Sequence, residues 1–310
     1  MEKQEKISVV IPVYNSAGSL VELIDRIHAT LSQLNYRYEV LMVDDCSKDN
    51  SWEIILQLKE KYPQHIKGVQ LGKNAGQHMA IICGLNLTDG DLIVTMDDDL
   101  QHPPEEIPKL LTKWEETGYD VVYGLYNTSK GHGKARGMAS NFVKKTSTKF
   151  SDNSFGNGSS FRLLSRKLID KLIRYPQQFV FIDEIIYWYT TKVTGVQVRH
   201  EPRKAGKSNY NWFKLFRLYL HIVVHFTALP LQLMVWGGLI FSIISFLLGV
   251  FFIVKKMVSG VSVEGYTSLM VVITFSTSLM LVCFGTIGRY IYQVHQNQNG
   301  KPPYTIREII

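Results

Sequence analysis

The chain has 310 residues, and 34 Lys and Arg against 27 Asp and Glu give a net charge of +7. This length allows one large domain or two, and a basic surplus suits a protein that meets nucleic acid or an anionic membrane. The cysteines, Cys46, Cys83 and Cys283, show neither disulfide nor metal-site spacing, which suits a reducing cytosol. We expect no secretion signal, because the first apolar run, Ile7–Val13, is too short.

The first 125 residues alternate short apolar runs with helix-like segments. The predicted strands are Ile7–Val13, Tyr38–Asp44, Ile66–Leu71, Leu92–Asp97 and Asp120–Tyr123. The predicted helices are Gly18–Leu34, Ser51–Tyr62, Gly76–Leu87 and Glu105–Glu116. This alternation predicts an α/β fold with a mostly parallel sheet and helices on both faces.

Three aspartates, Asp97, Asp98 and Asp99, follow the apolar run Leu92–Met96. Such a run predicts a buried strand, and open α/β sheets bind ligands at the carboxyl ends of their strands. Asp97 and Asp99 are two positions apart and can face one hard cation. Mg²⁺ or Mn²⁺ takes one or two carboxylates and completes its shell with water and phosphate oxygens. We therefore predict a metal–diphosphate site, with an ordinary acidic turn as the alternative.

Residues 125–160 are rich in Gly, Ser, Thr, Asn and Lys. This composition predicts a mobile active-site loop around 127–135, followed by a short helix. A plain linker is an equally good interpretation of the composition alone.

Two uncharged apolar runs, 231–254 and 267–288, each exceed the roughly 20 residues that a helix needs to cross a bilayer. They predict a two-helix transmembrane hairpin, with buried core helices as the alternative. Residues 211–230 predict an amphipathic helix in the membrane interface, because basic side chains recur on one of its faces.

The expected organisation is a globular domain at 1–210, the interface helix, the two spans and a tail at 289–310. Lys and Arg are in excess outside the hairpin, although Lys255 and Lys256 lie between the spans. The positive-inside rule therefore places the globular domain and the tail in the cytosol.

Several short motifs occur in a characteristic order. They are Ile11–Asn15, Val43–Asp49, Lys73–Gln77, Asp97–Pro104, Phe161–Leu163, Pro202–Tyr210 and Gly288–Tyr290. Any one of them is weak, but in this order the chain resembles the polyisoprenyl-phosphate glycosyltransferases. These belong to glycosyltransferase family 2, have a Rossmann-like GT-A fold, and include dolichol-phosphate mannose synthase and bacterial undecaprenyl-phosphate sugar transferases.

The resemblance implies roles for particular residues. The nucleotide sugar is expected at Pro12, Tyr14, Asn15, Asp45, Lys73, Asp97 and Asp98. The metal is expected at Asp97, Asp99 and Gln101. The acceptor phosphate is expected at Arg136, Arg162, Arg203, Lys207 and Ser208. Asp99 and Asp183 are the candidate catalytic residues.

Three positions depart from the family pattern. Ser16 stands where the family usually has Glu, and Cys46 stands where Gly is common. Ser160 stands where the family has a candidate catalytic Asp, so that role does not carry over. Asp183 and Glu184 offer replacement carboxylates, and acids at the start of a surface helix are the alternative interpretation.

The resemblance implies an inverting transfer of a sugar from a nucleoside diphosphate, expected to be UDP, to a polyprenyl phosphate, expected to be undecaprenyl phosphate. The product is a lipid-linked sugar for cell-envelope glycan or lipopolysaccharide modification. Mg²⁺ or Mn²⁺ is the expected cofactor. The expected location is the bacterial cytoplasmic membrane, with several spans, a cytosolic catalytic domain and a homo-oligomeric, tetrameric assembly.

Other functions were weighed against this one. A processive polysaccharide synthase typically has a Gln-x-x-Arg-Trp motif and more spans, and the sequence shows neither. A nucleic-acid binder is disfavoured, because the basic residues cluster beside the predicted spans. A membrane-anchored sugar-nucleotide-binding protein without turnover stays open because of Ser160. The sequence leaves the donor sugar open.

Overall fold

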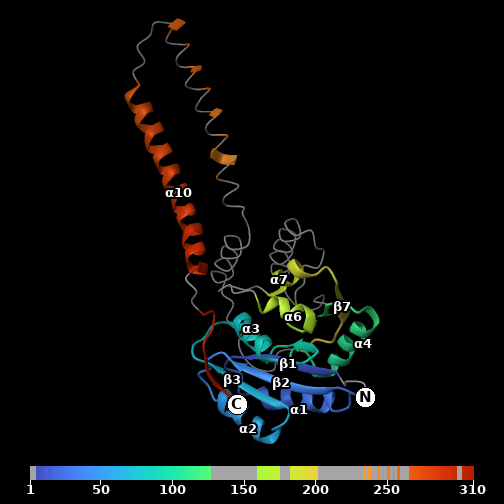
Figure 1. Cartoon of the computed structure of the whole chain (residues 1–310). Coiled ribbons are helices and arrows are strands. Elements are labelled where there is room, and N and C mark those ends of the chain that lie inside the picture. Colours follow the sequence, from blue (N-terminus) through green and yellow to red (C-terminus); the bar gives the residue numbers. More distant parts are fainter. Residues whose placement is uncertain are drawn as a thin grey trace. The chain divides into compact units, whose positions relative to one another are not determined.

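The computed structural model describes residues 5–126, 159–174, 182–201, 265–298 and 302–310, with scattered positions between 234 and 258 (Figure 1). The chain forms two compact units. Unit 1 contains Met1–Gly206 and Pro302–Ile310, and unit 2 contains Lys207–Lys301. The predicted loop at 127–135, the predicted interface helix at 211–230 and most of the predicted span at 231–254 lie outside the described residues.

Unit 1 is built on a mixed sheet, in which the described strands have the order β7-β5-β6-β4-β1-β2-β3-β8. The parallel strands are β1 (Lys6–Val13), β2 (Arg37–Asp44), β3 (Ile66–Leu71), β4 (Leu92–Thr95), β5 (Val121–Leu125) and β7 (Val193–Gln197). Two strands run antiparallel to their neighbours, β6 (Arg162–Ser165) between β4 and β5, and β8 (Ile306–Ile309) beside β3.

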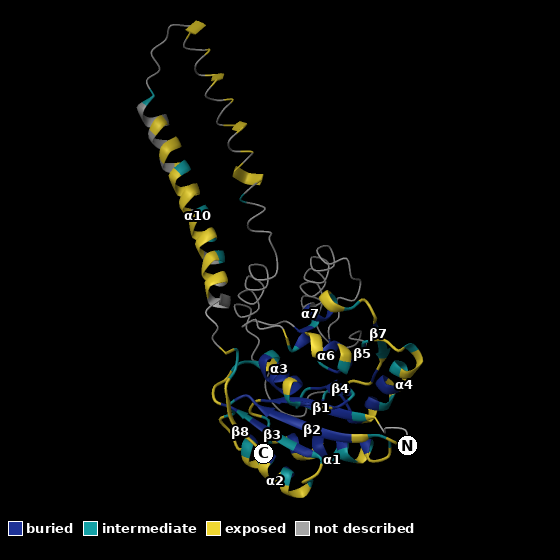
Figure 2. Cartoon of the chain, in the orientation of Figure 1, coloured by how far each residue is buried: buried dark blue, intermediate teal, exposed yellow. Residues whose placement is uncertain are grey.

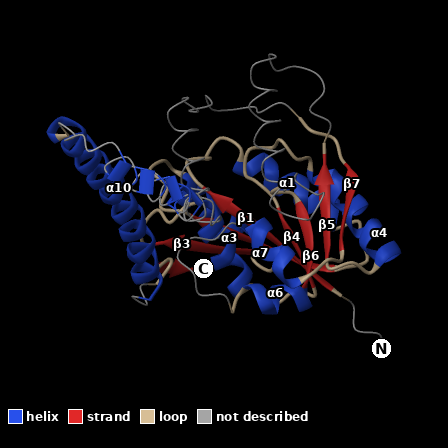
Figure 3. Ribbon diagram, turned by 90° about the horizontal axis from the view of Figure 1, so that it is seen from above, coloured by secondary structure: helices blue, strands red, loops and turns tan. Residues whose placement is uncertain are grey.

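Helices cover both faces of this sheet (Figure 3). One face carries α1 (Leu20–Leu31), α2 (Ser51–Lys61) and α4 (Ile107–Thr117), the last preceded by the 3₁₀ turn η1 (Pro104–Glu106). The other face carries α3 (Gln77–Leu87), α6 (Arg166–Leu172) and α7 (Ile182–Tyr189). The sequence therefore correctly predicts a GT-A-like α/β fold with helices on both faces.

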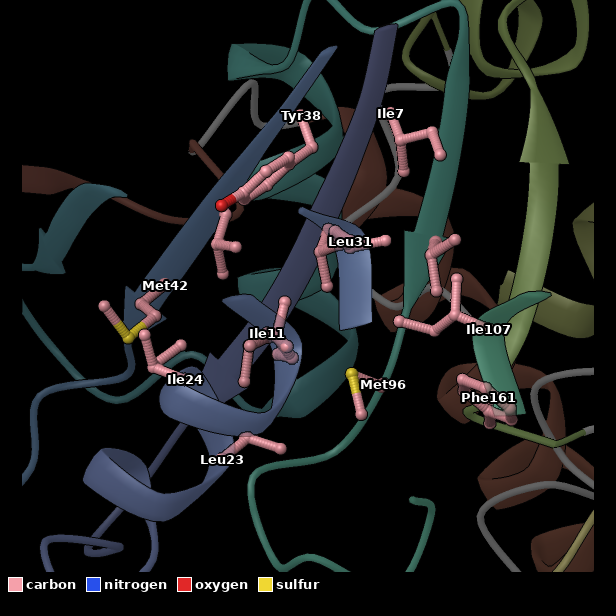
Figure 4. Packing of buried hydrophobic residues seen from close by; sticks show 14 of the residues in the cluster. Ile7, Ile11, Leu23, Ile24, Leu31, Tyr38, Met42, Met96, Ile107 and Phe161 are labelled. Atoms are coloured by element: carbon pink, nitrogen blue, oxygen red, sulfur yellow. The ribbon is translucent and has the colours of Figure 1, made fainter. Parts of the chain in front are cut away.

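The period-two geometry of the strands divides the core between these faces. Ile7 and Ile11 of β1 pack with Leu23 and Ile24 of α1 (Figure 4), whereas Val10 points to the α3 side. Full burial of a side chain of this size contributes about 1.5–3 kcal/mol. Because β1 is buried on both faces, it reads as a continuous apolar run, which is typical of a central parallel strand.

Each predicted strand and helix of the first 125 residues has a counterpart, with ends that differ by a few residues. One difference concerns the site. β4 ends at Thr95, whereas the predicted strand extends to Asp97, so the first aspartate already lies in the loop. The sequence did not predict β6, β7, β8 and α6, and it offered α7 only as the alternative interpretation of Asp183 and Glu184.

The tail expected at 289–310 is divided between the two units. Its first part continues α10 (Tyr266–Gln298), and its last part contains β8 and belongs to unit 1. The helix extends past the predicted end of the apolar run at Gly288 because the following polar residues are compatible with helical geometry.

In unit 2, α10 has 33 residues and leaves large apolar side chains exposed, among them Leu269, Phe275 and Leu281 (Figure 2). Within the described part of the chain, no helix combines the length and apolarity required to cross a bilayer. The predicted transmembrane hairpin is therefore not confirmed.

Candidate functional site

The candidate site lies where parallel strands β1, β2 and β4 end, in the three loops that follow them. Each loop contains a non-glycine residue with left-handed backbone geometry, with φ of 54° at Asn15, 57° at Cys46 and 63° at Leu100. Such conformations are unfavourable for most residues and cluster at functional sites. The left-handed φ at Cys46 also explains why glycine is common at this position in the family.

Asp97 is held from two sides. The Gln77 amide, at the start of α3, donates to Asp97 Oδ1 at 2.6 Å, and the Ser160 hydroxyl donates to Asp97 Oδ2 at 2.6 Å. Both donors are neutral, so they orient the carboxylate without adding a charge beside it.

Asp98 is turned toward the β1 loop. Its Oδ2 accepts from the Tyr14 backbone N–H at 3.1 Å, and its carbonyl accepts from the Ser19 hydroxyl at 2.6 Å. Burial raises the pKa of Asp98 to about 6, against the opposing hydrogen bonds from Ser16 and Tyr14. This carboxylate therefore links two loops.

Asp99 and Gln101 are joined within the same loop. Asp99 Oδ1 accepts from the Gln101 backbone N–H at 3.1 Å. Together with Asp97, these residues place carboxylate and amide oxygens in one short segment after β4.

The predicted nucleotide-binding residues of β1 occupy different environments. Pro12 is buried within β1, whereas Tyr14 is 45% exposed just after it. Asn15 connects the β1 and β2 loops, because its backbone N–H donates to Ser47 Oγ at 3.0 Å and its Oδ1 accepts from the Lys48 N–H at 2.7 Å. The exposed Tyr14 and the rigid Asn15 turn are suitable for contact with a ligand.

The carboxylate of Asp45 accepts its hydrogen bonds from the protein itself. Asp45 is 3% exposed, and its two carboxylate oxygens accept from the backbone N–H groups of Ala75 at 2.6 Å and Gly76 at 2.8 Å. Burial raises the pKa of Asp45, against these two hydrogen bonds. Asp45 thus ties the β2 loop to the start of α3, while Lys73 is exposed in the connecting loop.

Arg162 and Asp183 form an ion pair with each other. Arg162, in β6, is 1% exposed, and its guanidinium contacts the carboxylate of Asp183 in α7. Tyr123 in β5 donates to the same oxygen of Asp183 at 2.8 Å. The guanidinium of Arg162 is thus buried and paired with a carboxylate of the protein, and its expected role at the acceptor phosphate stays a prediction. The same contacts bind the carboxylate of Asp183 to protein groups.

The remaining residues expected at the acceptor phosphate, Arg136, Arg203, Lys207 and Ser208, lie outside the described residues. The segment that leads to the last three is tied to the acidic loop. The Glu201 N–H donates to the Gln101 carbonyl at 2.9 Å, and Arg26 of α1 contacts both Glu105 and Glu201. The basic stretch thus begins two residues beyond a direct contact with the acidic loop.

The sequence interpretation missed two residues at Asp97. Gln77 lies in a motif to which the resemblance assigns no role, and Ser160 stands out in the sequence only as a departure from the family pattern. The available signal for Gln77 was its place at the start of a helix that follows a parallel strand, since such positions face the same sheet edge as Asp97.

The donor set fits a hard divalent cation. Among the described residues there is no group of three or more His, Cys, Asp or Glu side chains that could hold a metal ion. Asp97, Asp99 and Gln101 instead supply the oxygen-rich partial set with which Mg²⁺ binds through one or two carboxylates, waters and substrate phosphates. Thiolate and imidazole ligands, which would favour softer metals, are not part of this set.

Comparisons with known proteins agree with this geometry. The model of Glycosyl transferase family 2 matches residues 8–173. An undecaprenyl-phosphate 4-deoxy-4-formamido-L-arabinose transferase of Photorhabdus laumondii is 34% identical over 312 residues, which cover 100% of this chain and 95% of that protein. The protein of the same description from Proteus mirabilis has the same identity and coverage.

Among solved structures, mannosyl-3-phosphoglycerate synthase from Rubrobacter xylanophilus is similar, with a TM-score of 0.51 and 18% identity over 76% of this chain and 75% of that chain. This likeness concerns the fold alone. The family match covers the acidic loop and the strands from β1 to β6, and the similarity to the transferases extends over the whole chain. The chain therefore belongs to glycosyltransferase family 2.

Proposed function

We propose that this protein transfers a sugar from a nucleoside diphosphate to a polyprenyl phosphate at a membrane, with UDP as the expected nucleotide and undecaprenyl phosphate as the expected acceptor. The observation that carries the proposal is the acidic loop after β4, in which Asp97 is oriented by Gln77 and Ser160 at the carboxyl end of the parallel strands. The 34% identity to undecaprenyl-phosphate sugar transferases over the full chain supports the acceptor class.

In this reaction an oxygen of the acceptor phosphate attacks the anomeric carbon, and the nucleoside diphosphate leaves from the opposite face, which inverts the configuration. Negative charge accumulates on the leaving diphosphate. A divalent cation held by Asp97, Asp99 and Gln101 would supply charge stabilisation to that group. The three oxygen-bearing side chains would hold and orient the cation, while the hydrogen bonds from Gln77 and Ser160 keep the carboxylate of Asp97 in one orientation.

The acceptor needs little help from a base. A phosphate monoester has a second pKa near 6, so it is largely dianionic at cytosolic pH and already nucleophilic. This fits a chain in which Ser160 replaces the family's Asp and Asp183 is paired with Arg162. The alternative of a binding protein without turnover, suggested by Ser160, is disfavoured because the full-length relatives at 34% identity are transferases.

A membrane location is part of the proposal. α10 exposes Leu269, Phe275 and Leu281, which suits contact with lipid. The chain leaves unit 1 after Gly206 and rejoins it at Pro302. A hairpin between these points returns to the side of the membrane from which it started, which agrees with a cytosolic catalytic domain in the bacterial inner membrane. The tetrameric homo-oligomer remains an expectation that light scattering of the purified protein tests.

The deciding experiment uses the purified full chain in liposomes that contain undecaprenyl phosphate. A panel of nucleotide sugars, beginning with UDP-linked 4-deoxy-4-formamido-L-arabinose, is tested for lipid-linked product by mass spectrometry. We expect product with one donor, loss of product after chelation with EDTA, and recovery with Mg²⁺ or Mn²⁺. No lipid-linked product from any donor, or undiminished product in the metal-stripped enzyme, would contradict the proposal.

The lipid acceptor provides a second test. Arg203→Ala is expected to raise the Michaelis constant for the polyprenyl phosphate more than that for the donor, because a guanidinium is well suited to binding phosphate. The exposed Arg37→Ala serves as a matched control, since Arg37 lies at the opposite end of β2 from the candidate site. A raised donor constant with an unchanged acceptor constant would assign Arg203 to the donor instead.

A further inference from the structure

The buried ion pair between Arg162 and Asp183 lies near the site, and the transfer mechanism leaves it unused. Arg162 is 1% exposed, and the side chain of Asp183 is 15% exposed. Burial lowers the pKa of Arg162, but Asp183 and Tyr123, through their charges and hydrogen bonds together, outweigh it and raise the pKa overall. A charged group in such a position requires its partner, because an uncompensated buried charge is strongly unfavourable.

The pair is connected to the acidic loop by directional hydrogen bonds. Arg162 Nε donates to Thr95 Oγ1 at 3.2 Å, and Thr95 Oγ1 in turn donates to the carbonyl of Ser160 at 2.7 Å. The single proton of the threonine hydroxyl therefore points to Ser160, while a lone pair accepts from Arg162. Thr95 is fully buried, and in the pairing of β4 with β6 it lies opposite Arg162. The sheet therefore fixes these orientations.

Ser160 completes the connection. Its backbone carbonyl is held by Thr95, and its hydroxyl donates to Asp97 Oδ2 at 2.6 Å. Ser160 also precedes Arg162 by only two residues, so a displacement of Arg162 moves Ser160 through the chain as well as through Thr95. A change at Asp183 thus has a short physical route to the orientation of Asp97.

We propose that Asp183 is a positioning residue, which acts through Arg162, Thr95 and Ser160 to hold Asp97 in the orientation that binds the metal–diphosphate group. The inference rests on the proposed function, because it assigns a role within the same site. It differs from the role expected from the resemblance, in which Asp183 is catalytic. Groups that orient a metal ligand commonly change metal affinity about 10–100-fold when they are removed.

The test measures binding of Mn²⁺ to the purified full chain in the presence of UDP, by the decrease of the free Mn²⁺ signal in electron paramagnetic resonance. We expect Asp183→Asn and Ser160→Ala each to raise the Mn²⁺ dissociation constant about tenfold. The double variant is expected to match the single ones, since both changes interrupt the same connection. Asp170→Asn on α6 is the control, because Asp170 is exposed and contacts only Arg166 among the described pairs.

Kinetics separate positioning from direct contact with substrate. In the transfer reaction, Asp183→Asn is expected to raise the apparent Mn²⁺ constant, with kcat at saturating Mn²⁺ close to that of the unmodified protein. Direct participation would instead lower kcat at saturating Mn²⁺, leave the Mn²⁺ constant unchanged and add to the effect of Ser160→Ala. Any one of these three results, a lower kcat at saturating Mn²⁺, an unchanged Mn²⁺ constant or additivity with Ser160→Ala, would overturn the inference.

Folding is checked by thermal unfolding of every variant. If Asp183→Asn does not fold, the pair is removed as a whole with Arg162→Met and Asp183→Leu, which leaves no buried charge without a partner. That variant is expected to bind Mn²⁺ about tenfold more weakly, and unchanged binding would refute the inference. If the unmodified protein neither binds Mn²⁺ with UDP nor transfers a sugar, the proposed function fails, which is distinct from failure of the positioning role.

Discussion

Ser160 donates a hydrogen bond to Asp97, with 2.6 Å between Ser160 Oγ and Asp97 Oδ2. The family usually has an aspartate at the position of Ser160, and a second carboxylate at this distance would repel the charge of Asp97 or share a proton with it. Serine instead supplies a proton without a charge. This chain therefore has one carboxylate, oriented by a neutral donor, where two acidic groups would compete.

The aspartates of the acidic loop are expected to be essential for transfer. Asp97→Asn and Asp99→Asn each remove a charge at which a divalent cation would bind, so several kcal/mol of charge stabilisation is lost in the transition state. Asp97→Asn also replaces one acceptor oxygen by an NH₂ group that faces the donors Gln77 or Ser160. We expect no measurable transfer by either variant, with unchanged circular dichroism. Near-normal turnover of either variant at saturating Mn²⁺ would contradict the assignment of Asp97 and Asp99 as metal ligands.

Gln77 is expected to support metal binding from outside the metal's own ligands. Its amide donates to Asp97 Oδ1 at 2.6 Å, so Gln77→Ala frees that oxygen to rotate. We expect the Mn²⁺ dissociation constant in the presence of UDP to rise about tenfold. Gln57→Ala on the exposed side of α2 is the matched control. Equal Mn²⁺ binding by Gln77→Ala and the control would show that this hydrogen bond does not orient Asp97.

The stability of the metal-free protein is expected to depend on pH through Asp98. Burial raises its pKa from 3.8 to about 6 in the folded protein. A raised pKa means that the folded state holds the proton more tightly, so this contribution to stability is complete below pH 3.8 and is lost as the pH rises through 6. At pH 8 the ionised carboxylate costs the fold up to about 3 kcal/mol.

Asp98→Asn removes this dependence while retaining an oxygen acceptor for the Tyr14 N–H. In EDTA, the gain in melting temperature of Asp98→Asn over the unmodified protein is expected to be larger at pH 8 than at pH 5. Asp170→Asn should show no such change, since this carboxylate is exposed. A difference between Asp98→Asn and the unmodified protein that is the same at both pH values would contradict the role of Asp98.

The sequence predicted the central strands and the acidic loop because both follow from local patterns. β1 is a continuous apolar run, and three aspartates directly follow the apolar run that contains β4. The partnership of Arg162 with Asp183 was not predictable in this way, because it joins β6 to a helix, α7, that packs on one face of the sheet. The motif implies a phosphate-binding role for Arg162. In the structure its guanidinium contacts Asp183, at a position that the local sequence indicates as the start of a helix.

The end of the chain gives a second example. Residues 306–309 form a short segment, Ile-Arg-Glu-Ile, for which the sequence alone offers no partner. They form a strand only because β3 provides an open edge for antiparallel pairing. The sequence predicts this segment only as a tail after an apolar run. It belongs to unit 1 because β8 pairs with β3, which lies more than 230 residues earlier in the chain.

Removal of residues 302–310 is therefore expected to destabilise unit 1. Gly68 and Ile310 exchange two backbone hydrogen bonds, at 2.9 and 3.2 Å, and the Gly72 N–H donates to the Thr305 carbonyl at 2.7 Å. The side chain of Ile310 packs against the core over Gly68, where an added Cβ would lie 2.8 Å from Ile310 Cγ1. Without the tail these groups lose their partners, and β3 becomes an edge strand among those described.

We expect the shortened protein to melt at least about 4 °C lower than the full chain, which corresponds to roughly 2 kcal/mol for a unit of this size. Gly68→Val in the full chain tests the same contact without truncation, because its side chain would meet both Ile55 and Ile310. Glu308→Ala is the control, since this side chain is exposed on β8 and its strand pairing is made by the backbone. If truncation and Gly68→Val both leave the melting temperature unchanged, β8 contributes nothing to the stability of the sheet. A lower melting temperature in both, with Glu308→Ala unaffected, means that the segment after α10 is needed to complete unit 1.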